Sequence, residues 1–334
     1  MYDCSKELLK FYDKHVKLSA EDQKKLADYR DTNIDRVKKG LKDSAKPSPI
    51  KFINQGSYAM DTIIQHPEND YDLDIGIQFN KVDLVGPKGG EYSAKEARDM
   101  VCEAVQDKRF NKAPEVRLKC VRIYYNEGYH IDMPIYREYE NALKETIIEI
   151  AGSDWEETNP EAVTKWFSDA VINKSPDTSN GRQMRRIVRL IKCWAQNKVS
   201  NKPSGFIISK LVDEKYISAD GRDDESLYKT LSAIYNRLMY DKNVYHPVLN
   251  GTLISEGKEK AVKSMYERLE SSLKILDDLN DANCTKQTAL KAWKKFFGHD
   301  YFDSLIKEYS DSLISVASVV PSSPVEKQGG ERFA

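Results

Sequence analysis

Residues 71–79 read Tyr-Asp-Leu-Asp-Ile-Gly-Ile-Gln-Phe, and from residue 72 their polar and apolar positions alternate. A period of two residues is typical of a β-strand with one buried face, so this segment predicts a strand. Asp72 and Asp74 then share the polar face, about 6.5–7 Å apart at about 3.3 Å per residue. Two carboxylates repel each other by roughly 4 kcal/mol at about 4 Å and an effective dielectric constant of about 20. The pair therefore indicates a cation at this face.

Two other interpretations of the acidic pair compete with a metal site. An EF-hand calcium loop starting at residue 70 needs glycine at its sixth position and glutamate at its twelfth. The chain has Ile75 and Lys81 there, so the calcium loop is excluded. A solvated acidic face on an ordinary strand remains the alternative.

A glycine–serine turn precedes the acidic strand, in the segment Gly56-Ser57-Tyr58-Ala59-Met60. Glycine lets the backbone turn tightly, and Ser57 is expected to cap a helix that begins at Tyr58. Free N–H groups at a helix start, together with the positive end of its dipole, attract an anion. Such a turn means little alone. Next to paired aspartates, it predicts a phosphate-binding turn beside metal-binding carboxylates.

A third carboxylate, Asp132, lies in a predicted strand. Residues 115–125 and 129–136 both have extended patterns, and the turn at 126–128 between them predicts a hairpin. Pro134 predicts that the second strand ends early or lies at a sheet edge. Between apolar neighbours, Asp132 would be costly to bury unless it is paired or binds metal. It is the best third ligand for a site with two metal ions; a hydrogen-bonded aspartate at a strand end is the alternative.

The overall charge is nearly balanced, with 52 basic and 53 acidic residues and a net charge of -1. No global field therefore directs the chain to nucleic acid or to a membrane. The five cysteines are scattered without a Cys-x-x-Cys motif, which argues against a zinc site and a disulfide framework. The N-terminus is charged where a signal peptide needs an apolar core, and no apolar run reaches membrane-spanning length. A cytoplasmic protein is expected.

From Pro160 onward, helical patterns replace the strand patterns. In the segment 181–194, arginines and Lys192 surround an apolar face, and no acidic residue occurs between Asp177 and Asp213. A basic helix is often only a solvated face. The lack of compensating acids nevertheless favours contact with a triphosphate or a nucleic-acid backbone. Ser204 predicts a second helix start that could receive phosphate.

At 334 residues the chain is a large single unit or two lobes, and its patterns predict an α+β fold in which helices follow a mixed sheet. We expect the sheet over residues 1–158, together with an N-terminal spine helix that Ser19 caps. The helices are expected over residues 159–318. Residues 319–334 have no packing pattern and are expected to be a disordered tail.

Several of these residues resemble a known family, the polymerase-beta-like nucleotidyltransferases. The residues that carry this resemblance are Gly56, Ser57, Tyr58, Ala59, Thr62, Asp72, Asp74 and Asp132. The segments Arg189–Trp194, Pro203-Ser204 and Ala292–Gly298 are similar to a narrower group. That group contains oligoadenylate synthase, cyclic GMP–AMP synthase and the bacterial CD-NTases of CBASS anti-phage systems. The similarity covers residues 15–315, with one departure at Asp61, where many relatives have glycine.

The resemblance implies a two-lobed polymerase-beta-like fold, in which residues 1–158 form the catalytic lobe and residues 159–318 form a helical lobe that closes the nucleotide cleft. It also implies roles for particular residues. Asp72, Asp74 and Asp132 would bind two Mg²⁺ ions, and Asp132 would also help the attacking ribose hydroxyl lose its proton. The residues expected to bind the triphosphate of ATP or another NTP are Gln55, Gly56 and Ser57, with Lys192 and Ser204 at the outer phosphates. The product would be a cyclic di- or trinucleotide that triggers a separate effector protein. Partner proteins would act on the cyclase or on its tail, Gly329–Ala334, and nucleic acid is a possible activator.

Two alternatives to the cyclase remain. The chain could transfer nucleotides to RNA without a template, as tailing polymerases do. A tailing enzyme should extend an RNA primer and lose activity steeply with salt. It could instead be an inactive fold that binds nucleotide or nucleic acid as a sensor, although the presence of all three carboxylates argues against this.

Overall fold

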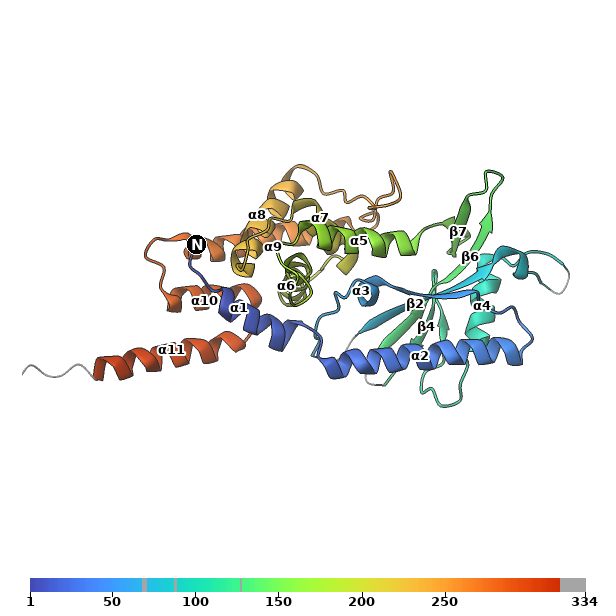
Figure 1. Cartoon of the computed structure of the whole chain (residues 1–334), viewed down its shortest axis with the longest axis horizontal. Helices are drawn as coiled ribbons and strands as arrows, with labels where there is room; N and C mark the ends of the chain where they lie inside the picture. The colour runs from blue at the N-terminus through green and yellow to red at the C-terminus, as the bar shows by residue number, and fades with distance from the viewer. Residues whose placement is uncertain (68–70, 87–88, 127, 319–334) are drawn as a thin grey trace, which may run out of the picture.

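The computed structural model shows a mixed sheet followed along the chain by a set of helices (Figure 1). It describes residues 1–67, 71–86, 89–126 and 128–318. The predicted α+β class with a sheet lobe and a helical lobe is confirmed. The predicted boundary at residue 158 stays a prediction, and the predicted tail 319–334 lies outside the described residues.

Eight strands form one sheet with parallel and antiparallel pairs. Their bounds are β1 (Lys51–Gln55), β2 (Asp72–Asn80), β3 (Glu115–Val116), β4 (Val121–Tyr124), β5 (His130–Met133), β6 (Ile135–Glu140), β7 (Thr146–Ala151) and β8 (Trp155–Glu157). Seven of them lie in the order β3-β4-β5-β2-β6-β7-β8, and β1 pairs with β2 outside this path.

The helices before residue 160 accompany the sheet or join the helical lobe, and those after it build the helical lobe. Their bounds are α1 (Ser5–Phe11), α2 (Ala20–Asp43), α3 (Gly56–Ala59), α4 (Ala94–Ala104), α5 (Pro160–Lys174), α6 (Gln183–Lys198), α7 (Gly205–Lys215), α8 (Asp223–Tyr240), α9 (Glu259–Leu276), α10 (Lys286–Phe297) and α11 (Tyr301–Ser318). The cap predicted at Ser19 is confirmed, because its side chain accepts a hydrogen bond from the Asp22 amide at 3.0 Å. None of the helices in the described ranges is long and apolar enough to cross a membrane.

The central strand β2 carries the acidic pair and has partners on both edges. Antiparallel β1 places Gln55 opposite Asp74 on one edge. On the other edge, β5 runs parallel to β2 and places Asp132 opposite the same Asp74. The prediction that the strand containing Asp132 ends early at Pro134 is confirmed, since β5 stops at Met133 and β6 begins at Ile135.

The extended run predicted over residues 115–125 is wrong in one respect. A tight turn, closed by a hydrogen bond of 2.8 Å from the Arg117 amide to the Cys120 carbonyl, divides it into β3 and β4. Only β4 pairs with β5, through an antiparallel register that sets Arg122 opposite Asp132. The alternation of side chains continues on both sides of the turn, so periodicity alone could not reveal the break.

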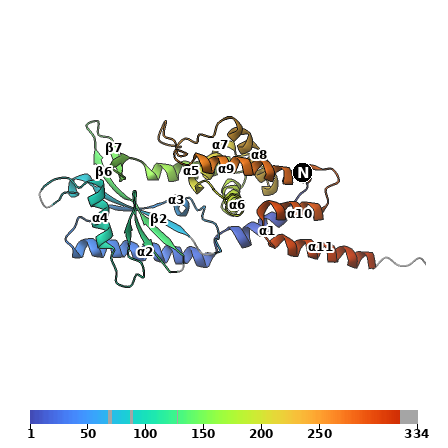
Figure 2. The ribbon, with the colours of Figure 1, turned by 180° about the vertical axis from the view of Figure 1, so that it is seen from behind.

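Two large clusters contain most of the buried apolar residues, and a third, small cluster contains Leu18, Leu26 and Ile63. One sheet face packs its buried side chains, among them Leu73, Ile75 and Ile77, against α2 and α4. The second cluster lies within the helical lobe and also contains N-terminal residues, including Leu8, Phe11 and Tyr12. The opposite views in Figures 1 and 2 both show α1 beside α10 and α2 along the sheet. The N-terminal segment therefore extends from the core of one lobe to the other.

Candidate active site

A cavity of about 490 Å³ lies where the polar side of β2 meets α3, α5, α6 and α7. Seven of the eight residues predicted for the site line it: Gln55, Gly56, Ser57, Asp72, Asp74, Lys192 and Ser204. Asp132 is not among the lining residues, although it is the register partner of Asp74 on the next strand. Residues from distant parts of the chain thus meet around one space. The structure brings them together, whereas their individual roles stay predictions.

The carboxylate of Asp74 lies in an unusual electrostatic environment. Burial raises the pKa of Asp74 to about 7, with further contributions from the neighbouring charges of Asp132 and Asp72. A buried carboxylate surrounded by like charges is stabilised in its ionised form by a nearby cation. Oxygen ligands of this kind are the ones that Mg²⁺ prefers. The chemistry of these donors therefore fits a magnesium ion at Asp72 and Asp74.

Arg122 holds the third carboxylate. Its Nε and Nη2 atoms donate to the two oxygens of Asp132 at 2.6 Å each, and Nη2 lies 3.5 Å from Asp72. Among the described residues, no group of three or more His, Cys, Asp or Glu side chains is arranged to hold a metal ion. Asp132 has the guanidinium of Arg122 as its partner, and its role as a third metal ligand stays a prediction. Arg122 was not predicted as a site residue, and the register of the hairpin, which sets it opposite Asp132, is the signal that could have identified it.

The glycine–serine turn differs from its prediction. Gly56, at φ +59°, is itself the first residue of α3, and no side chain caps this helix. The prediction that Ser57 caps a helix starting at Tyr58 is therefore wrong, because Ser57 lies inside the turn. A side-chain carbon at residue 56 would lie 2.0 Å from Oδ2 of Asp74, so only glycine permits this contact. With four residues, α3 also has a weaker dipole than a long helix.

Lys192 and Ser204 approach the cavity from the helical lobe. Nζ of Lys192 is buried and donates to the Thr62 carbonyl at 2.6 Å. Burial, and then the charge of Arg189, lower the pKa of Lys192 to about 7. The predicted cap at Ser204 is confirmed by its 3.4 Å hydrogen bond from the Ile207 amide. Glycine at position 205 leaves space for the Lys192 side chain, since a side-chain carbon there would lie 3.0 Å from Cε of Lys192.

The expected contact of the basic helix with a triphosphate or nucleic-acid backbone stays a prediction, but its arginines have partners within the protein. Arg186 is 5% exposed and pairs with Asp223 and Asp177, at 2.6 and 2.7 Å. Arg185 donates to the Met60 carbonyl at 3.1 Å. The compensating acids come from other parts of the chain, so their absence within 178–212 gave no sign of them. These arginines therefore stabilise the fold.

Asp61, the departure from many relatives, has a defined partner. It adopts φ +51° and forms an ion pair with Arg189, which also donates to the hydroxyl of Tyr12. Arg189 is 1% exposed, so Asp61 supplies the negative charge that this buried guanidinium needs. The contact connects the turn after α3 to helix α6.

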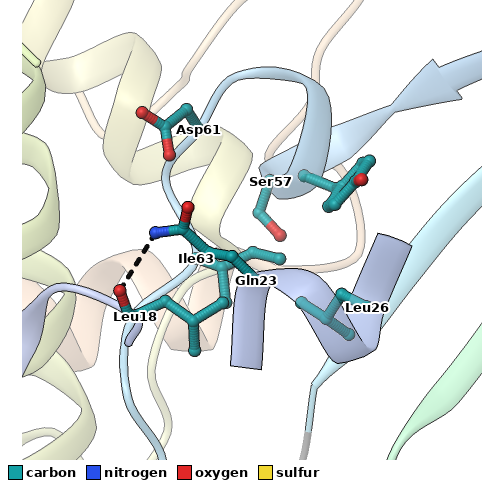
Figure 3. A pocket seen from close by; sticks show the side chains of 7 residues that line it. Leu18, Gln23, Leu26, Ser57, Asp61 and Ile63 are labelled. Carbon is teal, nitrogen blue, oxygen red and sulfur yellow. Dashed lines mark hydrogen bonds between the residues drawn. The ribbon is translucent and has the colours of Figure 1, made fainter. Parts of the chain in front are cut away.

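A second, smaller cavity of about 180 Å³ lies on the α2 side of the same turn (Figure 3). Gln23 borders it and donates to the Leu18 carbonyl at 3.0 Å, drawn as the dashed line in Figure 3. Ser57 lines both this cavity and the larger one. The Gly56-Ser57 turn therefore separates the two cavities, and its position depends on packing against α2 as well as α6.

Solved structures share this architecture. *Vibrio cholerae* DncV cyclic AMP-GMP synthase in complex with the linear intermediate 5′ pppA(3′,5′)pG has a TM-score of 0.66 and 17% identity, covering 85% of this chain and 92% of that one. The CdnC structure from *E. coli* MS115-1 with ATP has a TM-score of 0.64 and 15% identity, covering 90% and 98%. This chain therefore has the same two-lobed fold as these structures.

Sequence comparison finds related proteins for part of the chain. Residues 50–136 match the family described as cyclic GMP-AMP synthase DncV-like, nucleotidyltransferase domain. A curated protein from *Escherichia albertii*, "Cyclic GMP-AMP synthase", is 26% identical over 229 residues. The match covers 66% of this chain and 49% of that protein, so the chain spans about half the length of this relative. Residues 50–136 are therefore similar to the DncV-like nucleotidyltransferase domain, and the chain as a whole resembles the CD-NTases.

Proposed function

We propose that this protein is a magnesium-dependent nucleotidyltransferase that joins nucleoside triphosphates into a cyclic di- or trinucleotide. One observation carries the proposal: the Gly56-Ser57 turn, the Asp72/Asp74 pair and Lys192 line a single cavity between the two lobes. Mg²⁺ bound at the aspartates would neutralise charge on the phosphates and acidify the attacking hydroxyl. The chain's own residues position the substrate: the turn and Lys192 bind the phosphate chain, and the carboxylates orient it.

Asp132 takes part only after a rearrangement in this proposal. Its carboxylate is bound to Arg122 at 2.6 Å in the ligand-free protein. Arg122 is 18% exposed on its side chain, so it can turn toward solvent or toward a bound phosphate. Asp132 would then face the attacking hydroxyl and accept its hydrogen bond. Arginine forms bidentate contacts with carboxylate and phosphate alike, so a bound phosphate is a suitable second partner for Arg122.

ATP and GTP are the first substrates to test. One relative was solved with ATP, another with the linear intermediate pppA(3′,5′)pG, and the *Bradyrhizobium diazoefficiens* CD-NTase CdnG with GTP. The *E. coli* CdnC was also solved as a CdnC:HORMA-deltaN complex. We extend the proposal to a cytoplasmic role in anti-phage CBASS signalling, in which regulatory proteins bind the cyclase or its tail and the product activates an effector.

Product analysis tests the proposal. Purified protein is incubated with Mg²⁺ and labelled NTPs, singly and mixed, and the products are treated with phosphatase before chromatography and mass spectrometry. We expect a phosphatase-resistant species with the mass of a cyclic oligonucleotide. The double variant Asp72→Asn/Asp74→Asn should make none, since it keeps the side-chain shape but removes both charges. Asp28→Asn, at an exposed position on α2, is the matched control and should keep full activity.

Other products would support the alternatives. Linear, phosphatase-sensitive products or extension of an added RNA primer would support the tailing activity and contradict the cyclase. If wild-type protein makes no product even with cell extract, while the double aspartate variant keeps full function in cells, the protein is a sensor rather than an enzyme.

A further inference from the structure

Gln55 and Tyr136 form a buried polar contact beside the acidic pair. The hydroxyl of Tyr136 donates to Oε1 of Gln55 at 2.8 Å, and Tyr136 is 3% exposed. Nε2 of the same Gln55 amide is buried and has no hydrogen-bond partner among the described residues. Both side chains line the larger cavity. One end of the amide is therefore held by the protein, and the other end is an unused donor at the candidate site.

Neighbouring residues fix where this amide lies. Gln55 is the register partner of Asp74, so its side chain shares the polar face with the acidic pair. The amide then crosses Gly76, where a side-chain carbon would lie 2.1 Å from Nε2 and 2.8 Å from Cε2 of Tyr136. Glycine at position 76 thus provides the space in which the two side chains meet.

The hydrogen bond from Tyr136 also fixes which end of the amide is free. Burial is the largest cause raising the pKa of Tyr136, so its hydroxyl keeps its proton and remains a donor. A donor selects the carbonyl end of the carboxamide, and Nε2 must then point the other way. Buried amide donors in proteins normally have a partner, so an unused one next to a cavity indicates an acceptor that arrives with a ligand.

We propose that Tyr136 is a positioning residue that orients the Gln55 carboxamide, so that Nε2 donates to a phosphate oxygen of the bound nucleotide. The inference rests on the proposed function and deepens it. A phosphate oxygen is the acceptor the location favours, because Gln55 directly precedes the Gly56-Ser57 turn and lies opposite Asp74. Hydrogen bonds to an ionised acceptor are about twice as strong as neutral ones.

A structural explanation competes with this one. Oε1 of Gln78, on the same face of β2, is also buried without a partner. A solvent molecule between Gln78 and Nε2 of Gln55 would satisfy both amides and leave the nucleotide unaffected. Tyr136 would then matter only for packing and stability.

A double-mutant cycle separates the two explanations. The variants are Tyr136→Phe, Gln55→Leu and the two combined, with Tyr139→Phe as the matched control because its hydroxyl lies on the same strand, 3.4 Å from Glu149. Binding of a non-hydrolysable ATP analogue and of inorganic tripolyphosphate is measured by calorimetry with Mg²⁺. We expect Tyr136→Phe and Gln55→Leu each to weaken both ligands about tenfold, which is about 1.4 kcal/mol. The double variant should bind no more weakly than Gln55→Leu.

The outcomes distinguish this inference from the proposed function. If the losses in the double variant multiply, or if Tyr136→Phe changes only the melting temperature, Tyr136 acts through packing and the inference is overturned. If the losses of tripolyphosphate affinity in the variants are coupled but the wild-type protein makes no oligonucleotide, the result supports the inference and contradicts the cyclase. A cyclic product with multiplying losses supports the cyclase and contradicts the inference.

Discussion

At the scale of single residues, the role proposed for Lys192 predicts that nucleotide binding depends on pH. Its pKa of about 7 in the free protein means that the unfolded chain binds a proton that the folded chain lacks. Stability of the free protein therefore rises as the pH increases from about 7 toward the ordinary lysine pKa. A triphosphate has the opposite effect, because an anion beside Nζ favours the charged form and raises the pKa.

The expected result is proton uptake on nucleotide binding. At a pH of about 8, close to one proton should be taken up per nucleotide, and affinity should fall as the pH rises further. Calorimetric titrations with a non-hydrolysable ATP analogue, in buffers with different enthalpies of ionisation, measure this number directly. Lys192→Met should abolish the buffer dependence, whereas Lys165→Met, at an exposed position on α5, should retain it. Equal heats for the wild-type protein in all buffers would contradict the assignment.

At the scale of elements, the ion pair between Arg189 of α6 and Asp61 in the turn after α3 predicts that substitutions of its two members differ in their cost to stability. Arg189 is buried and Asp61 is largely exposed, with 2% and 57% side-chain exposure. Asp61→Asn leaves a buried guanidinium without its counter-charge, and asparagine still tolerates the positive φ of this position. We expect a loss of about 2 kcal/mol in the free energy of unfolding, measured by urea denaturation.

The reciprocal substitution provides the control. Arg189→Met replaces the guanidinium with an apolar side chain and leaves Asp61 in contact with water, so we expect it to cost less than Asp61→Asn. Adding Asp61→Asn to Arg189→Met should then change stability by less than about 0.5 kcal/mol. Full, additive costs in the double variant would show that the two residues act independently.

The same elements show how far the sequence could predict the structure. Local patterns were sufficient for the strand with Asp72 and Asp74 and for the cap at Ser19, because a period of two and a capping serine act over a few residues. They could not reveal that Arg122 faces Asp132, since that contact depends on the register between two strands. The pairing of Arg186 with Asp223 and of Arg189 with Asp61 could not be predicted for a similar reason, because these acidic partners are remote in sequence.

In the candidate site, too, local motifs were predictable from the sequence, whereas contacts between distant residues were not. Its residue types were predictable from motif chemistry, and seven of the eight predicted residues share one cavity. Tyr136 was not singled out, since a tyrosine that ends an apolar strand pattern is indistinguishable from a core residue until its hydroxyl is placed against Gln55. Ser57 was assigned the wrong role because the helix starts at Gly56, which has a positive φ, two residues earlier than predicted.

At the scale of the whole molecule, the N-terminal segment is part of the helical core. Phe11 is fully buried, with its ring 4.7 Å from that of Phe297 and 5.1 Å from that of Phe302. Phe11→Ala should therefore cost about 3–5 kcal/mol of stability. Denaturation followed by tryptophan fluorescence reports on this core, because Trp194 and Trp293 are both buried in it. Leu9→Ala, 39% exposed on the same helix, should cost less than about 1 kcal/mol. Equal losses would place Phe11 outside the core.

Charge distribution over the whole molecule also determines whether nucleic acid binds. The net charge is -1, and in α6 Arg185, Arg186 and Arg189 donate to protein acceptors that a phosphate backbone would have to displace. We therefore expect duplex DNA or RNA to bind no more tightly than about 1 µM at physiological salt.

The salt dependence of binding provides the stricter measurement. Each phosphate contact contributes about -0.9 to the slope of log affinity against log salt concentration. For a fluorescently labelled duplex followed by anisotropy between about 0.05 and 0.2 M salt, we expect a slope shallower than about -2. Cyclic product formation should be unchanged when the duplex is added. A slope near -5, together with faster product formation, would show that a basic surface outside α6 binds nucleic acid, and nucleic acid would then be an activator of this enzyme.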